Sequence, residues 1–534
     1  MAEAEIALPA PQQRWQDSPW LIAPVVALAA FMEVLDISIA NVALNHIAGS
    51  MAASQDESTW VLTSYLVTNA IVLPISGWMS EYFGRKRFFM ACIMGFTLSS
   101  LLCGTAPSLA FLVIFRAVQG FTGGGLQPVS QAILADSFPP QQRGMAFAFY
   151  GLAVVFAPAI GPTLGGWITD HASWRWVFLI NIPVGALLLF LVSFMVHDAP
   201  AAEEARRQRH SRGFSVDYLG FGLLALGLGC LQVVLDKGER DDWLSSHFIL
   251  LMSVLSAAGL VLFVLRELKA KEPIVDFRLL KNRNFAVANV LMFMLGFVLL
   301  ASTQLIPEFV QTSLGYTATD AGLVLSPGGL ALVLFMPVMG KLASKMEARW
   351  LVMFGLTVSG LALLYMTNFD LQVDYKTIAL ARLVQALGLA FLFIPINVAA
   401  YVGIPREKTN MGTALVNLSR NLGGSVGISL VQTVLARRMQ FHQSVLTESI
   451  TAAGANTQAL LDKLTAYFQS LPGHAADAAQ QAQAALYGIV QQQALMLSFI
   501  DTFKLMALVF LGVIPIVLLM NRRAEPQAEA PPAH

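Results

Sequence analysis

Long apolar stretches recur along the whole chain, separated mostly by short polar loops. A helix needs about 20 predominantly apolar residues to cross about 30 Å of hydrocarbon. Stretches near that length lie at residues 22–45, 60–80, 88–106, 108–133, 145–168, 176–196, 216–235, 247–265, 285–309, 319–340, 350–367, 377–401, 412–436 and 499–520. The pattern predicts an all-α polytopic membrane protein with 14 transmembrane helices.

Composition supports this class. Of the 534 residues, 56% are hydrophobic and 12% are charged, whereas soluble domains carry roughly 25% charged residues. The net charge is zero, so no electrostatic footprint for nucleic acid is present. The three cysteines, Cys92, Cys103 and Cys230, lie in predicted spans, and their odd number favours core packing over a disulfide or metal framework.

The basic residues of the loops orient the spans. Most of the 33 lysines and arginines fall in the N-terminus, in the loops on the same side of the membrane, and in the C-terminus. The positive-inside rule makes this side cytoplasmic. We therefore expect cytoplasmic tails at residues 1–21 and 521–534, and we expect the first span to be retained because no signal-peptide pattern precedes it.

The first predicted span contains two carboxyl groups, Glu33 and Asp36, three residues apart and hence on one face of a helix. At about 1.5 Å of rise per residue, Asp36 lies about 21 Å into the membrane. An ionisable group at that depth normally faces the bundle interior and marks a proton or substrate path. The alternative is a buried carboxyl that is protonated or paired for structural reasons only.

Arg116, in the fourth span, is the natural partner of these carboxyls. It lies about 10 Å from the outer end of its span, close to the depth of Asp36. Its guanidinium cannot lose its proton, so it needs an anion there. We expect Asp36 or Glu33 to supply it, and a purely structural ion pair is the alternative.

Two further segments carry backbone and charge patterns that predict conformational roles. The segment GWMSEYFGRKR, after the second span, has glycines, an acid and bases spaced as in a structured latch. The alternative is simple anchoring by the basic residues. The residues of this predicted latch are Gly77, Glu81, Gly84, Arg85 and Arg87. The fifth span ends with residues that permit close helix contact or bending, namely Pro158, Gly161, Pro162, Gly165 and Gly166.

An internal repeat divides the chain. RAVQG at Arg116 is echoed by RLVQALG at Arg382, and GWMSEYFGRK from Gly77 is echoed more weakly, at nearly the same offset, by GKLASKMEAR from Gly340. We expect two six-helix bundles, at 22–196 and 285–520, with the spans of 197–284 and their basic linkers inserted between them. The second bundle contains a possible polar site of its own, from Glu308, Arg382 and Arg420.

The segment 437–498 is a long loop on the outer side, rich in Ala and Gln. Its composition predicts two amphipathic helices around the Pro-Gly turn at residues 471–473. The other outer loops are short, so this segment is a candidate docking element, and a cap over the protein's own spans is the alternative.

Together these motifs resemble the major facilitator superfamily, specifically its fourteen-span drug:proton antiporters of the EmrB/QacA type. The similarity rests on LDISIANVAL, GWMSEYFGRKR, RAVQG, GPTLGG and WRWVFLINIPVG, and covers nearly the whole chain. It implies a bacterial inner-membrane pump with alternating access between two halves. The long outer segment is similar to EmrB-like pumps, which implies a periplasmic membrane-fusion adaptor and an outer-membrane channel as partners.

We therefore expect proton-driven export of hydrophobic or amphipathic small molecules, with Asp36, Glu33 and Arg116 in proton coupling. No phosphate-binding GxxxxGK[ST] motif is present, so the proton gradient rather than a bound cofactor supplies the energy. The alternatives are a proton-coupled exporter or symporter of a specific metabolite or fatty acid without an adaptor, a membrane enzyme and a receptor. The eight scattered histidines argue against a metal-dependent enzyme, and a receptor leaves the duplicated halves unexplained.

Overall fold

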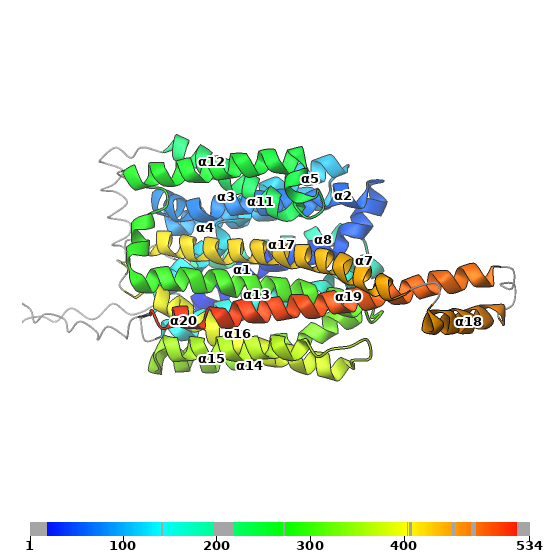
Figure 1. Ribbon diagram of the computed structural model, residues 1–534. Helices are drawn as coiled ribbons and strands as arrows, with labels where there is room; N and C mark the ends of the chain where they lie inside the picture. The colour runs from blue at the N-terminus through cyan, green and yellow to red at the C-terminus, as the bar shows by residue number, and fades with distance from the viewer. Residues whose placement is uncertain are drawn as a thin grey trace, which may run out of the picture.

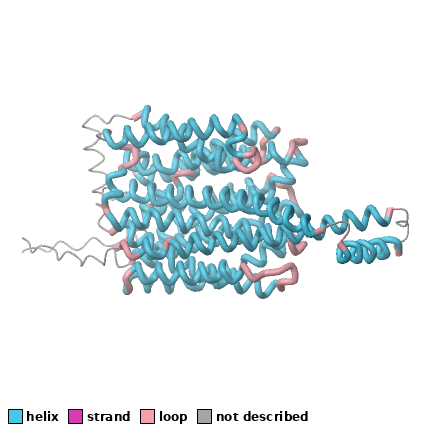
Figure 2. Tube along the Cα trace, viewed as in Figure 1, coloured by secondary structure: helices cyan, strands magenta, loops and turns pink. Residues whose placement is uncertain are grey.

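The structure, a computed structural model, describes residues 19–139, 142–196, 217–270, 273–402, 404, 408–450, 454–470 and 477–520. Its regular elements are helices (Figures 1 and 2). The α-helices are α1 (Pro19–Ser50), α2 (Gln55–Ser58), α3 (Trp60–Phe83), α4 (Arg85–Gly104), α5 (Leu109–Gly123), α6 (Leu126–Ser137), α7 (Arg143–His171), α8 (Trp176–Leu179), α9 (Asn181–Met195), α11 (Tyr218–Lys237), α12 (His247–Lys269), α13 (Arg283–Thr312), α14 (Ala318–Lys345), α15 (Ala348–Met366), α16 (Tyr375–Ala400), α17 (Thr409–Ser449), α18 (Ala455–Gln469), α19 (Ala478–Gly512) and α20 (Ile514–Val517). Most of the two predicted tails, the linker at 197–216 and the turn at 471–473 lie outside the described residues.

The predicted spans are present as helices. In the described part of the chain, 12 spans are long and apolar enough to cross a bilayer, and α7 adds one more as two arms bent by 45°. The fourteenth is α17, which runs through the bundle beside α13 although its polar residues, such as Asn417 and Arg420, lower its hydropathy (Figure 1). The all-α, fourteen-span fold expected from the sequence is confirmed.

The helices form two bundles that meet along two seams. On one seam α7 lies against α14, and on the other α3 lies against α17. At the first seam a Cβ added to Gly144 would lie 2.5 Å from the carbonyl oxygen of Gly340, so the two backbones are in direct contact. Nearby, the rings of Phe147 and Tyr401 stack at 5.6 Å. The exact limits of the bundles remain as predicted from the sequence.

The inserted pair, α11 and α12, packs on the outside of the bundles. α11 contacts α3 of the first bundle and α17 of the second, while α12 lies outermost (Figure 1). Just before α11, Asp217 forms an ion pair at 2.7 Å with Arg266 near the end of α12. Hydrogen bonds from this guanidinium lower the pKa of Asp217. Because α11 contacts both α3 and α17, the helix pair α11–α12 covers the α3–α17 seam.

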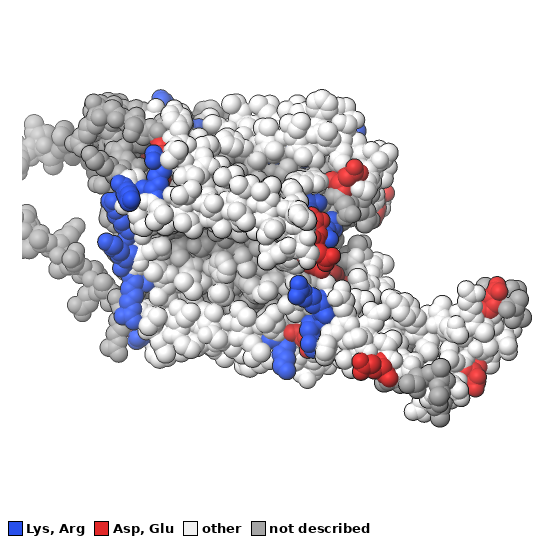
Figure 3. Space-filling model, turned by 45° about the horizontal axis from the view of Figure 1, so that its top comes forward, with Lys and Arg blue, Asp and Glu red and all other residues white. Residues whose placement is uncertain are grey.

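Charge is distributed unequally between the two ends of the bundle. Figure 3 shows a row of Lys and Arg along the end opposite α18, whereas acidic and basic side chains are mixed at the end that bears α18. This asymmetry agrees with the loop charges used above to orient the spans. We call the two ends the basic side and the hairpin side.

The outer segment differs from its prediction. The sequence predicted two helices in 437–498, whereas the described residues contain three helical arms: α17 continues to Ser449, α18 follows, and α19 begins at Ala478. α17 continues because no Gly or Pro follows Gly427 in it. α18 packs on α19. The end of α17, α18 and the start of α19 project beyond the bundle, and we call this projection the hairpin (Figure 1).

Candidate functional site

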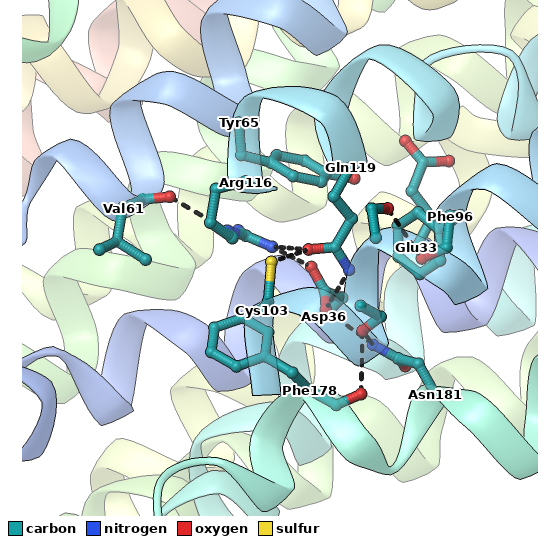
Figure 4. Close-up of polar contacts among 12 residues, drawn as sticks. Glu33, Asp36, Val61, Tyr65, Phe96, Cys103, Arg116, Gln119, Phe178 and Asn181 are labelled. Carbon is teal, nitrogen blue, oxygen red and sulfur yellow. Dashed lines mark hydrogen bonds and ion pairs between the residues drawn. The ribbon is translucent and has the colours of Figure 1, made fainter. Parts of the chain in front are cut away.

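A buried ion pair occupies the interior of the first bundle (Figure 4). Nη1 of Arg116, on α5, donates to Oδ2 of Asp36, on α1, at 2.5 Å, and both side chains are fully buried. The other carboxylate oxygen, Oδ1, accepts from the amide of Gln119 at 3.0 Å and from that of Asn181 at 2.7 Å. The side chain of Asp36 is therefore bound by one cation and two amides.

The guanidinium of Arg116 is fixed by three further groups. Its Nε donates to the carbonyl oxygen of Val61, on α3, at 3.0 Å, and its Nη1 donates to Oε1 of Gln119 at 2.8 Å. The ring of Tyr65 lies 4.2 Å from its central carbon, a cation–π contact. Asp36 and Arg116 thereby connect α1, α3, α5 and α9.

Sequence reasoning paired Asp36 with Arg116 but missed the amides. Gln119 follows Arg116 by three residues, so helical spacing alone places it on the same face. Asn181 begins α9 and lies in WRWVFLINIPVG, a segment used above only for its family resemblance. Its amide also donates to Ser100 of α4 at 3.0 Å, and no local pattern indicates this long-range contact.

Glu33, one helical turn before Asp36, lies in a different environment. Figure 4 shows it apart from the Arg116 pair. Its Oε1 accepts from the amide of Asn69 at 2.9 Å, and its Oε2 is buried without a hydrogen-bond partner. Arg420, on α17, is the cation whose charge acts on it. Glu33 therefore faces the second bundle, whereas Asp36 is neutralised within the first.

Polar contacts cross between the bundles beside Glu33. Arg420 donates to the side-chain oxygen of Gln127, on α6. The amides of Gln131 and Asn417 bond to each other at 2.9 and 3.3 Å. These contacts join α6 to α17, so the interior groups of the first bundle are linked to the second.

The structure separates the polar residues predicted in the second bundle. Glu308 accepts from the amide of Gln432 at 2.6 Å. Arg382 is bound by neutral side chains of α13 and α16, and Arg420 lies at the seam. They occupy three places rather than one site.

The turn after the second span is a single residue. α3 ends at Phe83, α4 begins at Arg85, and Gly84 between them has φ = 90°, a conformation that favours glycine. Gly77 is buried in α3, and Glu81 lies in the last turn of that helix. An ion pair at this turn joins Arg85 to Asp136, on α6. The predicted latch thus has a partner that the sequence did not indicate.

We expect Arg85→Gln to slow transport about two- to fivefold, because a half-buried ion pair contributes on the order of 1 kcal/mol. Substrate preference should be unchanged, since the pair lies far from the interior groups. The initial rate of uptake into vesicles measures this. Arg87→Gln is the matched control, because Arg87 is exposed in the same turn. A normal rate in the Arg85 variant, or an equal loss in both, contradicts the latch.

The fifth span bends and packs closely on the first. α7 bends by 45° between Pro158 and Ile160, where proline removes a backbone donor, and Pro162 follows within the same helix. A Cβ on Gly161 would lie 2.2 Å from Oγ of Ser38, and one on Gly165 would lie 3.2 Å from Ile39. Gly166 has nothing within 4 Å. Close contact with α1 thus requires Gly161 above all.

Gly161→Ala should therefore push α7 away from α1 at a cost of about 1–3 kcal/mol. We expect a lower melting temperature and strongly reduced transport by protein that still inserts in the membrane. Gly166→Ala, five residues on in the same helix, should leave both unchanged. Similar melting temperatures and transport rates of the two variants would show that the close contact of Gly161 with α1 supports neither stability nor transport.

In the described part of the chain, no group of three or more His, Cys, Asp and Glu side chains could hold a metal ion. A duplicated, fourteen-span bundle with a buried ion pair in its interior is the architecture of a multi-pass membrane protein. The family model of the Major Facilitator Superfamily matches residues 26–453, and the chain belongs to this family.

Relatives match nearly the whole chain. The multidrug export protein EmrB of Haemophilus influenzae is 36% identical over 498 residues, covering 93% of this chain and 94% of that protein. The fatty acid resistance protein FarB of Neisseria gonorrhoeae is 34% identical over 495 residues, covering 92% and 94%. The proton:xylose symporter XylE has the same fold, with a TM-score of 0.57 at 16% identity over 90% of this chain and 94% of that chain.

Proposed function

We propose that this transporter exports hydrophobic or amphipathic small molecules in exchange for protons, by alternating access between its two bundles. The observation that carries the proposal is the fully buried ion pair of Asp36 with Arg116. Similarity to multidrug export proteins supports the substrate class. The protein works in a bacterial inner membrane with both termini in the cytoplasm, as the basic side suggests.

The proton acts on the ion pair. Protonation removes the charge of Asp36, so the carboxyl no longer attracts the guanidinium of Arg116. Because Arg116 is also bound to Val61 on α3, loss of the pair weakens the connection of α1 to α3 and α5. A proton can therefore favour one arrangement of the bundles and substrate the other. Glu33 is a second proton acceptor, on the face toward Arg420.

The hairpin docks a periplasmic membrane-fusion adaptor, which continues to an outer-membrane channel. Two observations support this proposal: the arms project beyond the bundle (Figure 1), and large apolar side chains are exposed on them, among them Leu460, Tyr467, Tyr487 and Ile489. A helical pair of this kind offers a face for a partner helix.

A second candidate function is export of a specific fatty acid without an adaptor. The similarity to FarB over 92% of the chain favours it. The two candidates differ in breadth of substrate and in the need for a partner.

Exchange in proteoliposomes tests the proposed function. We would impose a pH gradient and follow ethidium, an amphipathic cation, and dodecanoate, an amphipathic anion. The proposal expects gradient-driven transport of at least ethidium, and it is wrong if a purified, folded protein moves neither. Transport of dodecanoate alone would favour the second candidate.

A further inference from the structure

Arg382 in the second bundle is the repeat counterpart of Arg116. The offset that carries Arg116 to Arg382 carries Gln119 to Gln385 and Asp36 to Ser302. The contacts repeat as well. Nη1 of Arg382 donates to Oε1 of Gln385 at 2.7 Å and to Oγ of Ser302 at 3.0 Å. The second bundle therefore repeats the interior site of the first, with a hydroxyl in place of the carboxylate.

This replacement leaves a buried cation without a counterion. Arg382 is 4% exposed, and the groups that bind its guanidinium are neutral: Ser302, Gln385 and, at 3.2 Å, Oγ1 of Thr303. Among the residues that the structure describes, no carboxylate pairs with it. Burying an unpaired charge is costly, so an anion here would be strongly favoured.

The acidic residues on the same two helices are engaged elsewhere. Oε2 of Glu308, on α13, accepts from Gln432 of α17. Asp374 precedes α16 and caps it by accepting from the backbone N–H of Thr377. Neither is available to Arg382 in this arrangement.

Two buried donors of the second site lack the acceptors that their counterparts have in the first bundle. There, Nε of Arg116 donates to Val61 and Nε2 of Gln119 donates to Oδ1 of Asp36. In the second bundle, Nε of Arg382 and Nε2 of Gln385 have no hydrogen-bond partner in the protein. Unsatisfied buried donors are rare in native structures and each calls for an explanation.

We propose that Arg382 and Gln385 bind the carboxylate head group of an amphipathic substrate beside Ser302, through the two donors that have no partner in the protein. The chemistry favours two oxygens over a single atom, because Arg116 and Gln119 each reach a different oxygen of Asp36. A carboxylate can offer one oxygen to Nε of Arg382 and the other to Nε2 of Gln385, whereas chloride offers one centre. The proposal rests on the proposed export function, since the buried site is reached only as the bundles move.

Binding to the purified full-length protein in nanodiscs tests the site without requiring transport. The probe is radiolabelled dodecanoate, with empty nanodiscs subtracted, and dodecan-1-ol is the neutral comparison with the same tail. Charge-assisted hydrogen bonds predict that Arg382→Gln weakens dodecanoate binding about tenfold or more, with no change for dodecan-1-ol. Lys504→Gln, which removes an exposed cation of α19, is the matched control and should bind as wild type.

Ser302→Asp separates a binding role from a folding role. The new carboxylate should pair with Arg382 as Asp36 pairs with Arg116, raising the melting temperature while abolishing dodecanoate binding. Unchanged binding in Arg382→Gln or in Ser302→Asp overturns the proposal. So does equal competition by chloride at the concentration of dodecanoate, which would make this a site for an inorganic ion. If wild type binds dodecanoate through Arg382 yet transports neither probe, the export function fails and the site stands.

Discussion

Asp36→Asn should reduce pH-gradient-driven export to the level of protein-free liposomes. The substitution removes the carboxyl that we propose takes up the proton, and with it the negative charge that lies 2.5 Å from Arg116. Leaving the guanidinium buried without its partner costs about 3–5 kcal/mol, so the single variant should also be less stable. The measurement is ethidium transport under an imposed pH gradient, with the melting temperature of the same preparation.

The double variant Asp36→Asn/Arg116→Gln separates these two effects. Removing both charges restores much of the stability, because no unpaired charge remains in the interior. It cannot restore a proton-accepting carboxyl, so export should stay absent. Glu33→Gln should be milder, since Glu33 is not part of the ion pair. Gradient-driven export by a folded Asp36→Asn protein would refute the role of this residue.

Replacing residues 443–490 with a short Gly/Ser linker should abolish drug resistance in cells while preserving exchange by the purified protein. The cut removes α18 and the projecting arms but keeps the base of the hairpin. There Arg438 and His442 of α17 bind Asp501 of α19 at 2.5 and 2.7 Å. Because the two helices remain joined, the transport bundle should stay intact.

The measurements are the growth of a complemented deletion strain on toxic substrates, co-purification with an adaptor, and exchange in proteoliposomes. Leu460→Ser and Tyr467→Ser test the same surface at full length, because both side chains are exposed. They should weaken co-purification and leave exchange unchanged. Loss of exchange in the shortened protein would make the hairpin part of the transport machine and would end the docking proposal.

Much of this structure follows from local sequence rules. Span length and apolarity predict the helices, and helical rise places Asp36 and Arg116 at similar depth. The permanent positive charge of Arg116 needs an anionic partner at that depth, and the sequence offers two candidates, Glu33 and Asp36. Choosing between these two requires the fold, because Glu33 and Asp36 lie on one face of α1 but meet different groups: Glu33 accepts from Asn69, whereas Asp36 pairs with Arg116.

Contacts between distant segments explain what the sequence could not predict. Asn181 reaches Asp36 across the bundle, Asp136 meets Arg85 from another helix, and Gln127 meets Arg420 across the seam. Each pairing depends on how helices pack, not on spacing within one helix. The internal repeat could be predicted in part. The sequence shows the echo of Arg116 at Arg382, but only the hydrogen bond from Arg382 identifies Ser302 as the counterpart of Asp36.

Proton movement driven by substrate tests the central claim most directly. Proteoliposomes containing a trapped pH-sensitive dye would be given an ethidium gradient, with no pH gradient and with the membrane potential clamped. The account predicts proton movement opposite to ethidium in wild-type vesicles and none in vesicles of the Asp36→Asn/Arg116→Gln protein. Ethidium transport by wild type without proton movement, or an equal proton signal in both preparations, would contradict it.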